Sequence, residues 1–209
     1  MSFSQNRSSH IALIKVVSIL LAFCISSPSF AYNSSYESSM PKVPLKRYLN
    51  NMYLDHTLGF RAGIPTTGQN IAINTKEVYV QKELSQYSIG LMIPSIEVAV
   101  AQFNGGVDNG YNYSIGPAYA IPMTGFASRL RLTAHTKVHW LTKHEFTSED
   151  GSSTKRYGGP VQWSYAVGGK YQIEKNTYAE YTWQHMSNGD RYDYNPALET
   201  HNFTVGVNF

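Results

Sequence analysis

Apolar and polar side chains alternate along the chain from about residue 53 to its end. The clearest case is SRLRLTAHTKVHW, residues 128–140, where apolar side chains occupy most even-numbered positions and every odd-numbered position is polar. Leu132, Val138 and Trp140 fall on one face, whereas His135 and Lys137 fall on the other. Because side chains alternate between the two faces of a strand, this pattern predicts a β-strand with one apolar and one polar face.

Seven further segments repeat the alternation, so we expect eight strands. They cover residues 53–63, 76–85, 95–104, 111–121, 160–171, 177–188 and 203–209. A length of about 11 residues is what a β-strand needs to cross a bilayer at a tilt of about 45°. Tyr and Trp recur near the ends of the apolar faces, as they do in the aromatic girdles of membrane barrels.

The strongly polar face favours a membrane barrel over a soluble one. A soluble β-sandwich or lipocalin-like barrel would turn its apolar face inward, whereas a membrane barrel turns that face to lipid and keeps a hydrated, hydrogen-bonded interior. The last residue, Phe209, ends an alternating strand, which is typical of outer-membrane barrels. The predicted fold is therefore all-β, an eight-stranded antiparallel transmembrane β-barrel in a bacterial outer membrane.

The first 31 residues have the parts of a secretory signal peptide. Arg7 and Lys15 make a weakly positive start, residues 16–25 form a short apolar core, and residues 29–31 form a small-x-small cleavage site. We therefore expect a signal peptide over residues 1–31, a polar periplasmic linker over residues 32–50 and the barrel over residues 51–209.

Composition excludes two other classes of protein. The chain has one continuous apolar run, whereas a helical membrane bundle needs several spans of about 20 residues. The formal charge is +3 without a cluster of Lys and Arg, so no nucleic-acid partner is expected. His135 and His139 share a strand face but lie about 13 Å apart, too far to share a metal ion.

The long connections indicate which end of the barrel faces outward. In an even-stranded barrel both termini are periplasmic, and the longer loops are extracellular. Residues 104–110, 146–159 and 188–200 are the expected long loops after the third, fifth and seventh strands.

Candidate chemistry gathers at the extracellular end of the seventh strand. His185 and Ser187 continue its lipid-facing side, where polar side chains are unfavourable unless they have a function. Glu199 begins the next strand and is adjacent in an antiparallel pair, so it could orient the His as the third member of a catalytic triad. Asn188 could supply a hydrogen bond to an oxyanion.

This arrangement resembles the PagL family of outer-membrane lipid A 3-O-deacylases. The resemblance rests on His185-x-Ser187-Asn188, on Glu199 twelve residues after the Ser, and on a final strand that ends at the C-terminus. It implies that Ser187 is the nucleophile, His185 the general base and Glu199 the acid that orients the His, with Asn188 as oxyanion support. It also implies hydrolysis of the ester-linked 3-hydroxyacyl chain at position 3 of lipid A, without a metal or other cofactor.

Other functions stay open beside this one. Residues 189–193 are particular to this sequence, so the resemblance does not define the acyl-chain preference. A structural or adhesive barrel of the OmpA or OmpX kind is the main alternative, and a phospholipase or acyltransferase of the same leaflet is another. The expected partners are lipid A or lipopolysaccharide, the outer membrane and the outer-membrane insertion machinery. A terminal Phe such as Phe209 suits recognition by that machinery. A homodimer is left open.

Overall fold

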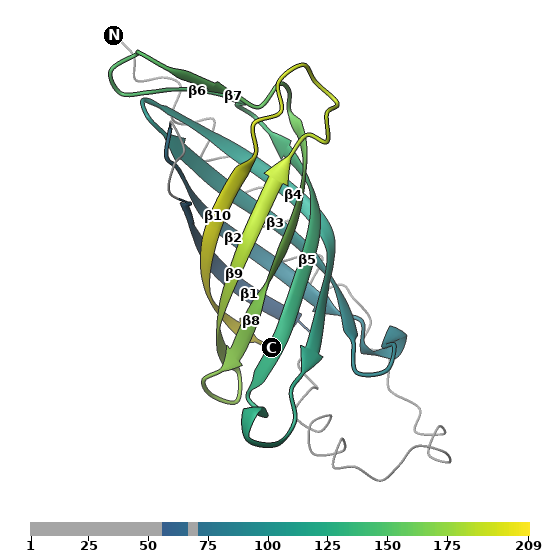
Figure 1. Ribbon diagram of the computed structural model, residues 1–209. Coiled ribbons are helices and arrows are strands. Elements are labelled where there is room, and N and C mark those ends of the chain that lie inside the picture. The colour runs from purple at the N-terminus through teal and green to yellow at the C-terminus, as the bar shows by residue number, and fades with distance from the viewer. Residues whose placement is uncertain (1–55, 67–70) are drawn as a thin grey trace. The chain divides into compact units, whose positions relative to one another are not determined.

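Eight of the ten described strands close into one antiparallel barrel in the computed structural model, which describes residues 56–66 and 71–209 (Figure 1). The barrel strands are β1 (His56–Pro65), β2 (Ile73–Glu83), β3 (Ile93–Gly105), β4 (Asp108–Pro122), β5 (Leu130–Leu141), β8 (Val161–Gln172), β9 (Thr177–Ser187) and β10 (Leu198–Asn208). The predicted fold class is confirmed. The expected signal peptide and linker lie outside the described residues.

The barrel closes by pairing β1 with β10. This ladder runs from Thr57 opposite Asn208 to Pro65 opposite Thr200. The backbones of His56 and Phe209 also exchange hydrogen bonds of 3.3 and 2.9 Å. The first strand therefore starts, and the last strand ends, at the same end of the barrel, which is the periplasmic end in barrels of this kind.

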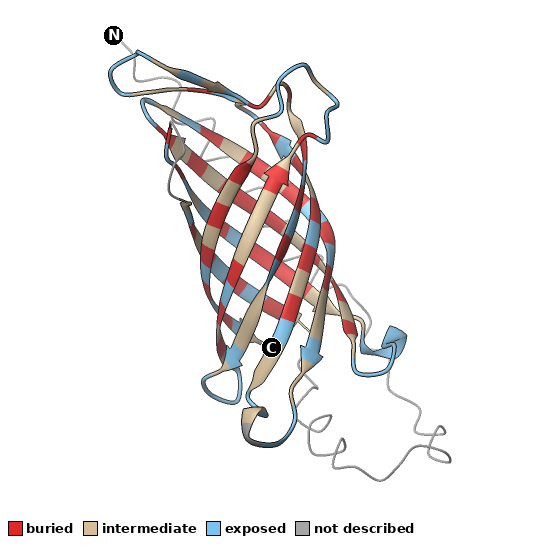
Figure 2. Ribbon diagram, in the orientation of Figure 1, coloured by how far each residue is buried: buried red, intermediate tan, exposed pale blue. Residues whose placement is uncertain are grey.

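The two faces of the wall have opposite character, as the alternation predicts. Phe60, Trp140 and Val205 are at least half exposed on the outside. Polar side chains such as those of Thr133 and Asn202 are buried inside. Figure 2 shows the resulting bands of buried and exposed residues along each strand. Among the described residues, no helix is long and apolar enough to cross a membrane.

Charged side chains fill the middle of the barrel. Arg61 forms ion pairs with Glu77 and with Glu97, the latter at 3.0 Å from Nη1 to Oε1. Lys137 Nζ lies 2.7 Å from Glu97 Oε1, and His135 lies within hydrogen-bond distance of the same Glu. Because these side chains are almost completely buried, opposite charges compensate one another inside the wall.

The interior is not polar along its whole length, which differs from the expectation. Toward the end that holds the longer loops, an apolar cluster of inward-facing side chains fills the barrel. It comprises Ile71, Ile73, Ala101, Phe103, Leu141, Phe146, Tyr157, Met186 and Leu198. Phe146 and Tyr157 come from the loop above and pack edge to face at 6.0 Å. The cluster lies directly behind the strand ends that carry the candidate catalytic residues.

The connections differ from the predicted loops in two places. Residues 104–110 are not a long loop, because β3 and β4 continue until only Gly106 and Val107 separate them. The loop over residues 146–159 contains a hairpin of two short strands, β6 (Glu145–Thr147) and β7 (Thr154–Arg156), at the same end as the β9–β10 connection (Figure 1). The opposite end carries two short 3-10 helices, η1 (Ser85–Tyr87) and η2 (Gly125–Ala127).

Candidate active site

His185 and Glu199 face each other on the outer surface of the barrel. The register of β9 and β10 places them directly opposite. His185 Nδ1 lies 3.5 Å from Glu199 Oε1, and both side chains are partly exposed. The sequence-based expectation that these two residues are neighbours is met by the strand pairing alone.

Ser187 lies two residues beyond His185 on the same outward face, opposite Trp163 of β8. Among the described residues its hydroxyl makes no hydrogen bond to His185. Since Nδ1 of the imidazole faces Glu199, Nε2 is the ring nitrogen left to receive a proton from Ser187. Catalytic hydrogen bonds are often long without substrate, so this arrangement is compatible with a nucleophile and base pair.

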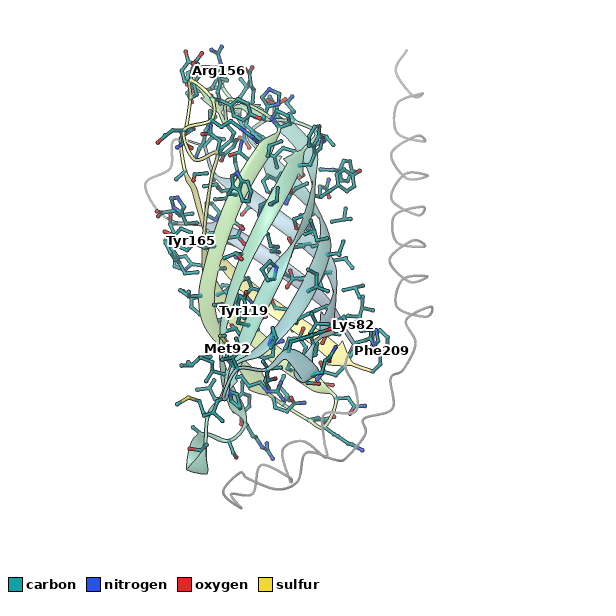
Figure 3. All side chains as sticks on the ribbon, turned by 90° about the vertical axis from the view of Figure 1, so that its right-hand side faces the viewer. Lys82, Met92, Tyr119, Arg156, Tyr165 and Phe209 are labelled. Carbon is teal, nitrogen blue, oxygen red and sulfur yellow. The ribbon has the colours of Figure 1, made fainter. Side chains whose placement is uncertain are left out.

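Aromatic rings pack against the imidazole of His185 on the outer surface of the barrel. Tyr165 of β8 stacks on His185 with 5.1 Å between ring centroids and 26° between planes. Trp183 lies 6.3 Å from the same imidazole and 5.8 Å from Tyr165. Figure 3 shows Tyr165 on the outside of the barrel wall, below Arg156 of the β6–β7 hairpin. No local pattern in the sequence marks Tyr165 as a support for His185, because this contact depends on the register between β8 and β9.

Asn188 points inward, behind Ser187, and is almost fully buried. Its side-chain nitrogen donates to the backbone carbonyl of Tyr157, at 3.1 Å, and to that of Tyr194. Its backbone N–H donates to Asn195 Oδ1 at 2.9 Å. Asn188 therefore joins the β9–β10 loop to the segment between β7 and β8, and its donors are engaged within the protein.

The β9–β10 loop turns sharply after Ser187. Gly189 and Asp190 have φ values of 62° and 59°. Asn195 Nδ2 donates to Asp190 Oδ1 at 2.7 Å and closes the turn. Because Asp190 holds this left-handed conformation without being a glycine, the turn depends on such side-chain bonds. Asn195 was not singled out from the sequence, because nothing near it in the chain marks it as a partner of the turn.

Gly158 lets the two extracellular loops approach closely. It has a φ of 75°, and a Cβ atom there would lie 2.4 Å from the carbonyl oxygen of Tyr194 and 2.6 Å from Cβ of Tyr192. Neighbouring Gly159 packs against the ring of Tyr192 in the same way. The segment after β7 thus packs closely against the loop that follows Ser187.

A lysine of the hairpin lies within electrostatic range of the site. Burial lowers the pKa of the Lys155 ammonium, and the Glu199 carboxylate acts in the opposite direction. The Lys155 ammonium also stands over the ring of Tyr157, 5.5 Å from its centroid. In the part of the chain that the structure describes, no group of three or more His, Cys, Asp and Glu side chains is arranged to hold a metal ion.

These features define the class of the protein. The eight strands close into a barrel with an apolar outer surface and a filled interior. The first strand starts and the last strand ends at the same end of this barrel. These are the features of an outer-membrane β-barrel. The family model described as lipid A 3-O-deacylase (PagL) matches residues 70–208, so the chain belongs to the PagL family. The protein is located in the bacterial outer membrane.

Two solved structures are similar to this chain. The crystal structure of the outer membrane enzyme PagL is similar with a TM-score of 0.57 and 12% identity, and the match covers 72% of this chain and 99% of that one. At this identity the likeness shows the fold alone. Neisserial surface protein A gives a TM-score of 0.44 at 12% identity, covering 74% of this chain and 94% of its own. No curated protein matches the chain in sequence.

Proposed function

We propose that this chain is a serine esterase that hydrolyses the ester-linked 3-hydroxyacyl chain at position 3 of lipid A, in the outer leaflet. Membership of the PagL family supports the activity and the substrate class. The observation that carries the catalytic detail is the pair of His185 and Glu199, 3.5 Å apart on the lipid-facing surface, with Ser187 on the same face.

In the proposed reaction Ser187 Oγ attacks the carbonyl carbon of the ester while His185 Nε2 takes the hydroxyl proton. Glu199 accepts a hydrogen bond from Nδ1–H, holds the imidazole tautomer and stabilises the imidazolium. Collapse of the tetrahedral intermediate breaks the bond to the sugar oxygen, which receives the proton from His185. A water molecule, deprotonated by His185, then hydrolyses the acyl-serine and releases the fatty acid.

Asn188 is proposed to support the oxyanion, as the family resemblance implies. Its donors bond to Tyr157, Tyr194 and Asn195 in the structure. Asn188 can therefore donate a hydrogen bond to the oxyanion only if the oxyanion replaces one of these acceptors. The same bonds also hold the loop that begins directly after the nucleophile.

The place of the site on the barrel suits an amphiphilic substrate. The acyl chains can lie against the apolar outer wall, and the sugar and phosphates can lie at the level of the loops. A substrate held in this way needs no deep pocket. Because the site lies at the extracellular end of the strands, water can reach it and hydrolyse the acyl-serine.

Mass spectra of lipid A and of phospholipids from cells that make the wild type or Ser187→Ala test this proposal. We expect the wild type to remove the mass of one 3-hydroxyacyl chain and the variant to leave lipid A intact. Ser88→Ala, which alters an exposed hydroxyl at the far end of the barrel, is the matched control and should behave as wild type. Loss of acyl chains from phospholipids, or a gain of mass on lipid A, would contradict the proposal and favour a phospholipase or an acyltransferase.

A further inference from the structure

A second polar pair lies on the outer wall beside the candidate active site. Tyr181 of β9 and His201 of β10 both face outward, and the hydroxyl of Tyr181 lies 2.8 Å from Nδ1 of His201. The two rings stack with 6.0 Å between centroids and 18° between planes. Phe203 packs on the other side of Tyr181 at 5.5 Å, so the pair is embedded in the apolar surface.

The pair lies deeper in the membrane than the catalytic residues, with His201 one same-face step from Glu199 along β10 and Tyr181 two such steps from His185 along β9. His201 follows Glu199 by two residues on the same face of β10, which is about 7 Å along the strand. It stands directly opposite Trp183, which contacts the imidazole of His185. The pair is therefore next to the candidate active site, on its membrane side, where the acyl chains of the substrate would extend into the bilayer.

A polar pair in this position is unfavourable unless it has a partner. Hydrocarbon offers no hydrogen bonds, so polar side chains that face lipid carry a free-energy cost. Tyr181 and His201 satisfy one bond between themselves, but Nε2 of His201 has no hydrogen-bond partner among the described residues. The proposed catalytic reaction uses neither side chain, so catalysis does not account for them.

We propose that Tyr181 and His201 bind the hydroxyl group of a hydroxylated acyl chain that lies beside the chain being cleaved. This inference rests on the proposed function. A chain attached next to position 3 of lipid A has its hydroxyl on the third carbon, a few ångströms below the sugar. His201 lies below Glu199 along β10, on the part of the outer wall that the acyl chains of such a substrate would cover. Nε2 of His201 and the Tyr181 hydroxyl together offer a donor and an acceptor to such a group.

The pair would then distinguish classes of lipid. The acyl chains of ordinary glycerophospholipids carry no polar group below the ester, so they leave Nε2 of His201 without a partner. A site that bonds to a substrate hydroxyl disfavours analogues that lack it. A single neutral hydrogen bond corresponds to a preference of about 2- to 12-fold.

Two synthetic substrates test this inference. Both are glucosamine monosaccharides with a 3-hydroxymyristoyl ester at O3, and they differ only in whether the amide-linked chain at N2 is 3-hydroxymyristoyl or myristoyl. The purified full chain in detergent micelles is compared with Tyr181→Phe and His201→Phe, which keep the stacked rings. Tyr171→Phe removes an equally outward-facing hydroxyl at the periplasmic end of β8 and is the matched control.

We expect the wild type and Tyr171→Phe to prefer the hydroxylated substrate in kcat/KM. Tyr181→Phe and His201→Phe should lose that preference and turn over the deoxy substrate at the wild-type rate. An unchanged preference in both variants, or an equal loss on both substrates, would overturn the inference. If the wild type cleaves neither substrate, the proposed function itself fails and the inference with it.

Discussion

Glu199 contacts His185 from a separate strand. A substitution of Glu199 can therefore remove the carboxylate that faces the imidazole without altering the nucleophile or the base. Its side chain is 42% exposed, and it contacts the imidazole across one strand pair. A carboxylate in this position fixes the tautomer and stabilises the positive charge that forms on the ring, and both effects grow as water is excluded by lipid.

Glu199→Gln should therefore reduce kcat by roughly 10³- to 10⁴-fold and leave the barrel intact. The amide keeps the size of the side chain but cannot stabilise the imidazolium. Initial rates on purified lipid A, together with the shift in gel mobility between boiled and unboiled protein, check activity and folding separately. Wild-type turnover by this variant would exclude Glu199 from the triad.

The sequence was sufficient to place His185, Ser187 and Glu199 on one face, because alternation and antiparallel pairing determine which side chains are neighbours. It could not foresee that Tyr165 stacks on His185, since that contact needs the exact register of β8 on β9. Nor could it foresee the hydrogen bond from Asn188 to the backbone carbonyl of Tyr157, which is 31 residues away in the chain. Both depend on tertiary packing and leave no local pattern.

At the scale of elements, the site depends on how two extracellular loops fit together. The segment after β7 presents Gly158 to the loop that follows Ser187, and the apolar cluster beneath includes Tyr157 from the first loop and Leu198 after the second. Alternation predicted the barrel strands because each predicted segment has at least seven residues in phase. It missed β6 and β7, since three residues are too few to show a period.

Gly158→Ala should lower activity at least 10-fold while the barrel still forms. The new Cβ would meet the backbone carbonyl of Tyr194 at 2.4 Å, and a side chain at φ 75° adds strain of about 1–2 kcal/mol. Gly151→Ala is the control, because Gly151 has a similar φ of 70° but open space around it. Equal rates of lipid A deacylation for the two variants would show that loop contact does not position the site.

At the scale of the whole molecule, stability and chemistry occupy different parts of the barrel. Buried ion pairs fill its middle, an apolar cluster fills the extracellular end, and the candidate catalytic residues lie outside the wall. Alternation indicated that the interior is polar but could not show that it is a compensated network. Which charges meet depends on the closure of the barrel, as in the contact of Glu97 on β3 with Arg61 on β1 and Lys137 on β5.

Glu97→Gln should destabilise the barrel by about 3–5 kcal/mol, because Arg61 and Lys137 would stay buried with one anion fewer. Glu83→Gln, at a partly exposed pair with Arg131, should change stability by only about 0–1 kcal/mol. Urea unfolding in micelles, followed by Trp fluorescence, measures both. Similar midpoints for the two variants would contradict the view that the network holds the interior together.

The proposed function requires that Ser187 on the outer wall attack the acyl ester at position 3 of lipid A. Incubation of purified wild type and Ser187→Ala with purified lipid A, followed by mass spectrometry of both products, tests it most directly. With the wild type we expect a free 3-hydroxy fatty acid and lipid A that lacks the acyl chain at position 3, and with the variant we expect neither product. Intact lipid A with folded wild type, or equal release by both proteins, would contradict it.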